Sequence, residues 1–223
     1  MRKLTLGQMR MPIGGGPKSA GKPLAKVAAS ALLSLLFFWS GVSALVYQIS
    51  WQRILFSSFG IDIESVTIIV STFMLGLGCG AIVGGLLADR WPRHVLLLFA
   101  ASEAGIGMFG LFSVAAIRAL GDVLIDSHPA TLAAANFLVL LVPTSMMGAT
   151  LPMLVAYVAK GGTSVGVSIG GLYFANTLGA AIGCYIIGFL WLMHFDLPSA
   201  VNAAAMVNLA VAAIVASMAR GLR

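Results

Sequence analysis

The segment that decides the fold, residues 65–90, reads SVTIIVSTFMLGLGCGAIVGGLLADR and ends in the charged run DRWPRH at residues 89–94. About twenty uncharged residues are enough for a helix to cross the hydrocarbon core of a bilayer. Gly76, Gly80 and Gly84 are spaced four apart, so they share one face of that helix. Such a face lets a neighbouring helix approach closely. The segment therefore predicts a membrane helix with a packing face made of glycine.

The rest of the chain has the same membrane character. Hydrophobic residues make up 60% of the 223 residues, charged residues make up 9%, and the mean hydropathy is +1.01. A soluble domain carries about 25% charged residues. We predict an all-α integral membrane protein with six spans, over residues 28–50, 64–88, 94–117, 131–158, 165–192 and 198–219. The predicted domains are a flexible basic tail at 1–27, a six-helix domain at 28–219 and a short C-terminal segment at 220–223.

Basic residues gather on one side of these spans. With the N-terminus in the cytoplasm, eleven of the 13 Lys and Arg residues lie inside, and only Arg53 and Arg118 lie outside. Five acids fall on the outer side, namely Asp62, Glu64, Asp122, Asp126 and Asp196. This asymmetry predicts a multi-pass protein of the cell (inner) membrane with both termini cytoplasmic. The net charge of +6 is then a topology signal, so the expected partner is the lipid bilayer and not nucleic acid.

The second and fifth spans resemble each other. The second carries glycine at every fourth position, and the fifth repeats that spacing with Gly179 and Gly183. Each is the middle helix of a three-helix set, and two such sets cross the membrane in opposite directions. This pattern favours an inverted 3+3 repeat. The alternative is that glycine-rich helices simply recur in membrane proteins.

Four sequence blocks indicate a narrower family. They read GVSALVYQISWQRILFSSFG at 41–60, the quoted segment at 65–90, PTSMMGATLP at 143–152 and GLYFANTLGAAIG at 171–183. The run from Gly85 to His94 also resembles the loop between the second and third helices of major facilitator superfamily transporters, with Pro92 where that family has glycine. Together the blocks resemble the membrane part of the spermidine-synthase-like membrane proteins, which are fused major facilitator/spermidine synthase proteins. The resemblance covers most of residues 35–195.

The resemblance implies a six-helix bundle like half of a major facilitator. In that family a cytoplasmic aminopropyltransferase-like domain commonly follows the helices. Because the sequence ends at Arg223, directly after the sixth span, we expect it to lack the synthase part, which a separate synthase-like protein could supply. Half a facilitator needs a second half, so we expect a homodimer or association with other membrane subunits.

Glu103 is the first candidate site residue. It lies nine residues after His94, or about 13 Å along a helix, near the middle of a bilayer core about 30 Å thick. A carboxylate at that depth is costly and usually faces a bundle interior or an aqueous cavity. We expect either a cation or proton site, or a protonated carboxyl that is hydrogen-bonded to a neighbouring helix.

Three further residues are candidates for ligand binding. Asn176 lies near the middle of the fifth span with Tyr173 close by, and it either joins helices or lines a cavity. Gln48 belongs to the outer end of the first span beside Tyr47 and Trp51. That end is either an interfacial aromatic belt or the rim of a vestibule.

The charged loop after the second span has two interpretations. By the resemblance, Asp89, Arg90 and Arg93 form a conformational latch between helix ends. Alternatively, they only anchor the topology. Pro92 makes the loop stiffer than the family pattern and weakens the case for a latch.

No arrangement for nucleophilic catalysis is visible, and the three histidines lack metal-ligand spacing. We therefore predict a protein that is not an enzyme and uses no cofactor or metal. The main hypothesis, with its ligand class taken from the resemblance, is a half-transporter-like module that binds or transports a small amine-like metabolite. The alternatives are a structural or assembly subunit whose glycine faces pack on partner helices, and a membrane anchor for a separate synthase-like enzyme.

Overall fold

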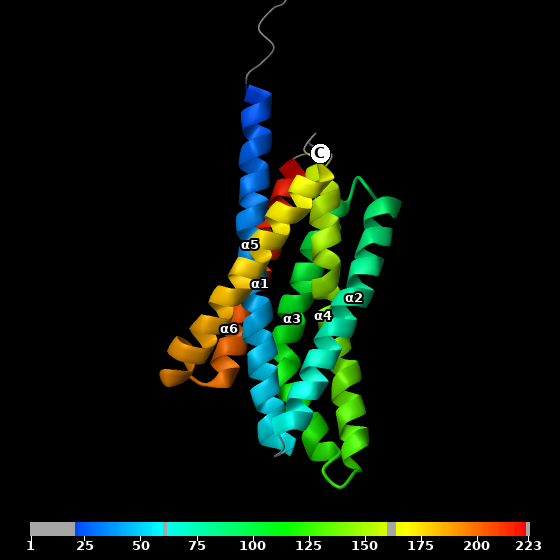
Figure 1. Ribbon diagram of the computed structural model, residues 1–223, viewed down its shortest axis with the longest axis vertical. Helices are drawn as coiled ribbons and strands as arrows, with labels where there is room; N and C mark the ends of the chain where they lie inside the picture. The colour runs from blue at the N-terminus through cyan, green and yellow to red at the C-terminus, as the bar shows by residue number, and fades with distance from the viewer. Residues whose placement is uncertain (1–20, 60–61, 160–163, 222–223) are drawn as a thin grey trace, which may run out of the picture.

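Six long helices make up nearly all of the described structure (Figure 1). The computed structural model describes residues 21–59, 62–159 and 164–221. The helices are α1 (Gly21–Phe59), α2 (Asp62–Arg90), α3 (Val95–Val123), α4 (Pro129–Ala159), α5 (Val165–Tyr185) and α6 (Leu197–Gly221). Each is long and apolar enough to cross a membrane, and these ranges contain no strand. The predicted all-α membrane class is confirmed.

α1 is much longer than the span predicted for it. Its 39 residues extend for about 58 Å, whereas the bilayer core is about 30 Å thick. The helix begins at Gly21, so the last seven residues of the segment predicted as a tail are helical. Residues 1–20 lie outside the described part of the chain.

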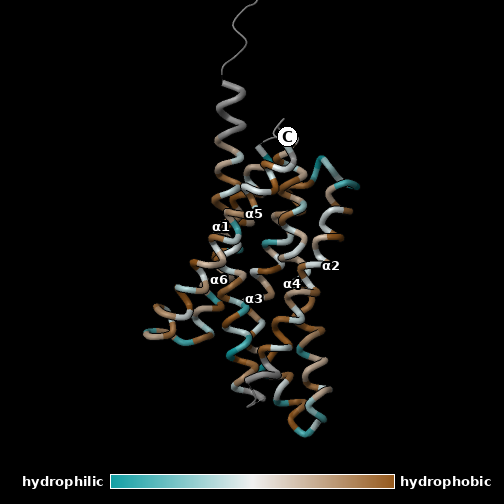
Figure 2. Tube along the Cα trace, in the orientation of Figure 1, coloured by the Kyte–Doolittle hydropathy of each residue, from teal (hydrophilic) through white to brown (hydrophobic). Residues whose placement is uncertain are grey.

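The helices alternate in direction, so both described ends of the chain lie at one end of the bundle, here named the terminal end (Figure 1). Arg90, the last residue of α2, and Arg93, in the α2–α3 loop, lie there too. Asp122, in the last turn of α3, and Asp126, in the turn between α3 and α4, lie at the opposite end. Figure 2 shows hydrophilic residues concentrated at such turns. The membrane side of each end stays a prediction. Of the basic residues assigned to the terminal end, those before residue 21, Lys160 and Arg223 lie outside the described residues.

The predicted glycine faces are used within the chain. Gly76, Gly80 and Gly84 of α2 pack directly against α4, where an added Cβ would meet its side-chain or backbone atoms. Gly179 and Gly183 of α5 pack in the same way against the backbone of α1. Glycine is required at these points because the two backbones nearly touch.

The helices pair as expected for an inverted repeat in which α1, α2 and α3 correspond to α4, α5 and α6. Under that correspondence the contact of α2 with α4 is equivalent to the contact of α5 with α1, and α3 packs on its own equivalent, α6. These three are the most extensive contacts in the structure. The correspondence extends to single residues. Gly80 packs on Ser145, and Gly183 packs on Val42. Gly183 follows Gly80 by 103 positions, and Ser145 follows Val42 by the same 103 positions. The arrangement is in keeping with the predicted 3+3 repeat.

The prolines of the fourth span do not interrupt it. Pro143 and Pro152 both lie inside α4, which runs through them as one helix. Next to the first proline, the hydroxyl of Thr144 adds a hydrogen bond within the helix by donating to the carbonyl of Leu140 at 2.9 Å. The irregular segment is instead the end of the fifth span, where α5 passes into a π-helix at Ile186–Leu190 and a 3-10 turn at Trp191–Met193.

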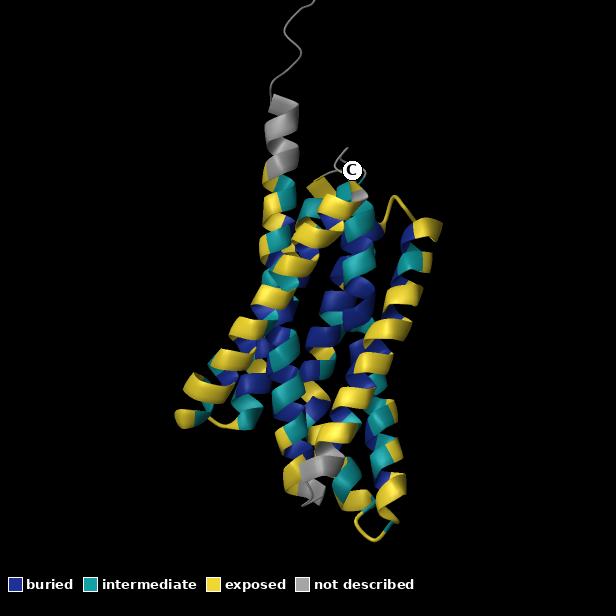
Figure 3. Cartoon of the chain, viewed as in Figure 1, coloured by how far each residue is buried: buried dark blue, intermediate teal, exposed yellow. Residues whose placement is uncertain are grey.

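The core lies mainly between α3, α4, α1 and α6, and the outer helices are exposed (Figure 3). Half of the most apolar window of α4 is buried, compared with 28% for α2 and 17% for α5. Exposed apolar side chains on α2 and α5 are expected where helices face lipid. The buried residues form two apolar clusters, one nearer each end of the bundle.

Candidate ligand-binding site

Glu103 is completely buried and held by two other helices. The hydroxyl of Ser40 on α1 donates a hydrogen bond to Oε1 at 2.7 Å. The Nδ2 group of Asn208 on α6 donates to Oε2 at 2.7 Å. Both carboxyl oxygens thus have a hydrogen-bond partner, an arrangement that an ionised carboxylate can make and that a protonated carboxyl can also make if its O–H donates to the hydroxyl of Ser40. Within the described part of the chain, no Lys or Arg forms an ion pair with Glu103.

These three side chains form a polar layer between the two apolar clusters. On α1, Ser40 lies between Phe37 of one cluster and Val46 of the other. Glu103 on α3 and Asn208 on α6 are flanked in the same way by members of both clusters. The layer crosses α3 at Glu103, about 12 Å from the start of the helix at Val95 and in its half nearer the terminal end. A buried polar layer at this depth is the strongest sign of a functional site in the chain.

The layer is not fully satisfied. Asn208 is 1% exposed, and its Oδ1 has no hydrogen-bond partner. Since its Nδ2 donates to a carboxylate, the amide is polarised and its oxygen becomes a stronger acceptor. Most buried polar atoms in proteins are paired, so this unpaired acceptor is an exception within the layer.

A cavity of about 630 Å³ reaches the polar layer from the terminal end. Its volume lies within the range of sites for small molecules. Most of its wall is apolar and comes from α1, α2, α4 and α5. Its polar lining residues are Ser40, Asp89, Thr150, Tyr173, Asn176 and Asn208.

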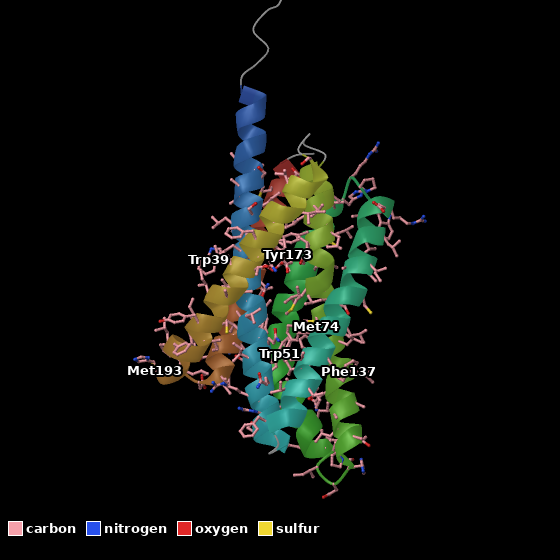
Figure 4. All side chains as sticks on the ribbon, in the orientation of Figure 1. Trp39, Trp51, Met74, Phe137, Tyr173 and Met193 are labelled. Carbon is pink, nitrogen blue, oxygen red and sulfur yellow. The ribbon has the colours of Figure 1, made fainter. Side chains whose placement is uncertain are left out.

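The cavity brings together several residues that the sequence predicted separately. Asn176 is half-buried on α5, lines the cavity, and also packs against Gly41 of α1. Tyr173, labelled in Figure 4, is 60% exposed and lies one turn nearer the terminal end. Glu103 is behind the wall, because its two partners Ser40 and Asn208 line the cavity while Glu103 itself does not. A ligand would thus reach the carboxylate through its partners.

Pro152 removes one helical hydrogen bond from the backbone of α4 at the cavity wall. Proline has no N–H, so it cannot donate the usual helical hydrogen bond to the carbonyl of Gly148. Both residues line the cavity. The helix itself continues through Pro152, so the proline changes the hydrogen bonding of the cavity wall without breaking α4.

Gln48 does not belong with this group. It is half-buried on α1, eight residues or about 12 Å beyond Ser40, and does not line the cavity. Its neighbours Tyr47 and Trp51 are fully buried and stacked with ring centroids 4.9 Å apart. Trp51 donates through Nε1 to the hydroxyl of Ser113 at 2.9 Å. Tyr47 and Trp51 are therefore core residues, and both alternatives, an aromatic belt or a vestibule rim, are wrong for them.

The three residues of the predicted latch separate into two groups. Asp89 lines the cavity at its terminal end, whereas Arg90 and Arg93 are exposed and do not line it. Among the described residues, Asp89 forms no ion pair with either arginine. Its role as a latch stays a prediction.

Sequence reasoning missed Ser40 and Asn208. Asn208 carried a usable signal, because an asparagine in an apolar span is uncommon and costly unless paired. Ser40 carried none, since serines are ordinary in membrane helices. No group of three His, Cys, Asp or Glu in the described ranges could hold a metal ion.

The curated proteins that this chain resembles are polyamine aminopropyltransferases. Those of Mycobacterium tuberculosis (strains CDC 1551 / Oshkosh and ATCC 25618 / H37Rv) and of Mycobacterium bovis (strain ATCC BAA-935 / AF2122/97) are each 29% identical over 175 residues, or 77% of this chain. The match covers 32% of each relative, so the chain spans about a third of the length of the curated relatives it matches. No family model matches, and no solved structure matches significantly.

This similarity agrees in part with the resemblance to spermidine-synthase-like membrane proteins. A chain with six helices that could span a membrane is similar to one part of proteins that are named as enzymes. The chain is therefore a multi-pass membrane protein by its helices, and is similar to part of an aminopropyltransferase. That it is not itself an enzyme stays a prediction.

Proposed function

We propose that this chain is a membrane module that binds a small organic amine in the cavity between α1, α2, α4 and α5. The single observation that carries the proposal is the buried Glu103, held by Ser40 and Asn208 at the inner end of that cavity. The ligand donates hydrogen bonds to the polar layer, and its positive charge offsets the negative charge of Glu103. Transport follows if the site opens alternately to the two ends of the bundle.

The electrostatics of the layer support a cationic ligand. A carboxylate moved from water into an apolar interior is strongly destabilised unless a positive charge or a proton compensates it. No described Lys or Arg pairs with Glu103, and no Lys, Arg or His lines the cavity. An ammonium group supplies both the missing charge and a donor for Oδ1 of Asn208, which has no partner.

The similar proteins point to the same ligand class. Their printed name refers to polyamines, which are organic amines. In an aminopropyltransferase that carried such a membrane part, an amine-binding membrane region would lie beside the enzyme region. On this proposal the chain serves as a binding or transport module, and a second copy completes a two-half transporter as a homodimer.

The test is calorimetric titration of the whole chain in lipid nanodiscs with n-butylamine at neutral pH. The native chain is expected to bind, and Glu103→Gln to bind at least about tenfold more weakly, since it keeps the shape but removes the charge. Asp126→Asn is the matched control, because Asp126 is an exposed acid in the turn between α3 and α4. Equal binding by the native chain and Glu103→Gln, or no binding by either, contradicts the proposal.

A second candidate function is the membrane anchor of a synthase-like enzyme. The observation that favours it is the match to about a third of each aminopropyltransferase, which leaves most of those proteins outside the similarity. The assembly-subunit alternative loses one of its supports, because Gly76, Gly80, Gly84, Gly179 and Gly183 already pack within the chain.

A further inference from the structure

A second cavity, here named the side cavity, lies between α1, α6 and the irregular end of the fifth span. Its volume is about 180 Å³. One wall is a stripe about 10 Å long on a single face of α6, formed by Ala200, Ala203, Ala204 and Val207. The other walls come from α1, from the π-helix and from Trp191, which follows it. The proposed amine site uses none of these residues.

The side cavity lies where the fifth span departs from the inverted repeat. In α2, Gly84 packs directly against the backbone of Ala149 on α4. The residue 103 positions after Gly84 is Ile187, and the residue 103 positions before Ala149 is Val46. Both line the side cavity. Because isoleucine stands where the repeat has glycine, the two backbones stay apart, and the end of the fifth span diverges from α1 (Figure 1).

The backbone changes form at the same place. Ile187 belongs to the π-helix at Ile186–Leu190, which interrupts the α-helical ladder of the fifth span. Short π-helical segments inside α-helices occur frequently at functional sites. The π-helix and the missing glycine are two features of the same wall, so the cavity is built into the sequence of this half of the repeat.

The wall of the side cavity is suited to hydrocarbon and not to water. Among its lining residues only Ser43 carries a hydroxyl, which donates to the carbonyl of Trp39 at 3.1 Å. The indole N–H of Trp191 donates to the hydroxyl of Ser199 at 3.2 Å. An apolar cavity of about 150 Å³ stays dry and takes up an apolar molecule. The occupant of the side cavity is therefore apolar.

The side cavity is accessible from the lipid near one membrane surface. Trp39 at its edge is 43% exposed, and an exposed apolar side chain on a membrane-spanning helix faces lipid. Trp191 and the exposed Phe195 lie with ring centroids 4.9 Å apart at the turn before α6, which is the composition of an interfacial aromatic belt. In Figure 4, Met193 of the same turn lies at the outside of the bundle.

We propose that the side cavity binds one acyl chain of a bilayer phospholipid, from the leaflet at the end of the bundle opposite the terminal end. The chain lies along the alanine stripe of α6, in contact with Ile187 and Trp191. A helix of a second copy, about 10 Å across, is too wide to enter a cavity of this volume. The bound chain fills the gap that the fifth span leaves beside α1, and its binding does not depend on the proposed amine site.

The first test is native mass spectrometry of the whole chain released from nanodiscs of palmitoyl-oleoyl phosphatidylcholine. The native chain is expected to retain one phospholipid. Ala203→Leu fills the cavity and displaces about two methylene groups of the acyl chain, so retention is expected to fall about tenfold. Ala210→Leu is the matched control, because Ala210 is exposed on the same helix and does not line the cavity. Ala203→Val, which fills less of the cavity, is expected to give an intermediate loss.

Thermal unfolding in mild detergent shows whether each variant folds and supplies a second readout. Added phosphatidylcholine is expected to raise the unfolding temperature of the native chain and of Ala210→Leu by about 2–4 °C more than that of Ala203→Leu. If Ala203→Leu does not unfold cooperatively, Ala203→Val takes its place in both measurements.

Three results would overturn the proposal. They are a native chain that retains no lipid, equal retention by the native chain and both Ala203 variants, and loss of a dimer in place of a lipid on filling the cavity. The last result would assign the side cavity to a second copy of the chain. None of them bears on amine binding, so the proposed function is tested separately.

Discussion

At the residue scale, the site depends on one buried carboxylate and the two side chains that hold it. Glu103 was visible in the sequence, because a single acid in a long apolar stretch is costly and needs a reason. Its partners were not, since Ser40 and Asn208 lie 63 and 105 residues away along the chain. Such pairings come from helix packing, which no local pattern encodes.

Asn208 is expected to stabilise the bundle as well as the site. Asn208→Leu removes a donor from the carboxylate of Glu103, and an unsatisfied buried group costs about 1–3 kcal/mol. Asn202→Leu is the matched control on the same helix, because Asn202 is exposed. It is expected to change stability by less than about 0.5 kcal/mol. Thermal unfolding in mild detergent measures the stability of both variants. Equal unfolding temperatures for the two variants would contradict a stabilising role of Asn208 in the polar layer.

At the element scale, the sequence predicted what glycine spacing and hydropathy encode. The glycine face of α2 and the matching glycines of α5 lie where the spacing indicated, each against another helix. The π-helical end of α5 was not predicted, because Ile186–Leu190 reads as an ordinary apolar run. Likewise, Tyr47 and Trp51 have the composition of an interfacial belt, and only the packing of α3 and α2 around them makes them core.

Alanine substitutions at Gly80 and Gly78 test the glycine face of α2, because they are expected to change the stability of the protein in different ways. A Cβ on Gly80 would meet the backbone of Ser145, whereas one on Gly78 meets nothing within 4 Å. Gly80→Ala is expected to destabilise the protein by about 1–3 kcal/mol through overpacking. Gly78→Ala is expected to be neutral, or stabilising by up to about 1 kcal/mol, because alanine is the better helix former. Unfolding in detergent distinguishes them, and a shift of the same sign and size in both would exclude close α2–α4 packing.

At the scale of the whole molecule, the charges divide between the two ends of the bundle. Arg90, Arg93 and Arg220 lie at the terminal end, and Asp122 and Asp126 lie at the opposite end. The six alternating helices could be predicted from hydropathy alone, because each run of apolar residues is long enough to cross a bilayer. The cavity could not, since its wall combines residues of five helices.

This division of charge predicts that the terminal end faces the cytoplasm. In a chain with Cys79 and Cys184 replaced by serine, a cysteine at His94 is expected to resist a membrane-impermeant maleimide in intact cells. A cysteine at Ser127, in the turn between α3 and α4, is expected to react. Both should react after the membrane is opened with detergent. Labelling of the His94→Cys chain in intact cells would reverse the assigned topology.

The extra length of α1 has a mechanical consequence. Its first seven residues, 21–27, add about 10 Å of helix beyond Ala28, where the apolar span begins, and in Figure 1 this rod rises past the neighbouring helices. The same helix carries Ser40 of the polar layer. A small tilt of α1 about that level therefore becomes a larger sideways displacement at Gly21. The start of α1 is therefore the point on this helix where a tilt would produce the largest displacement.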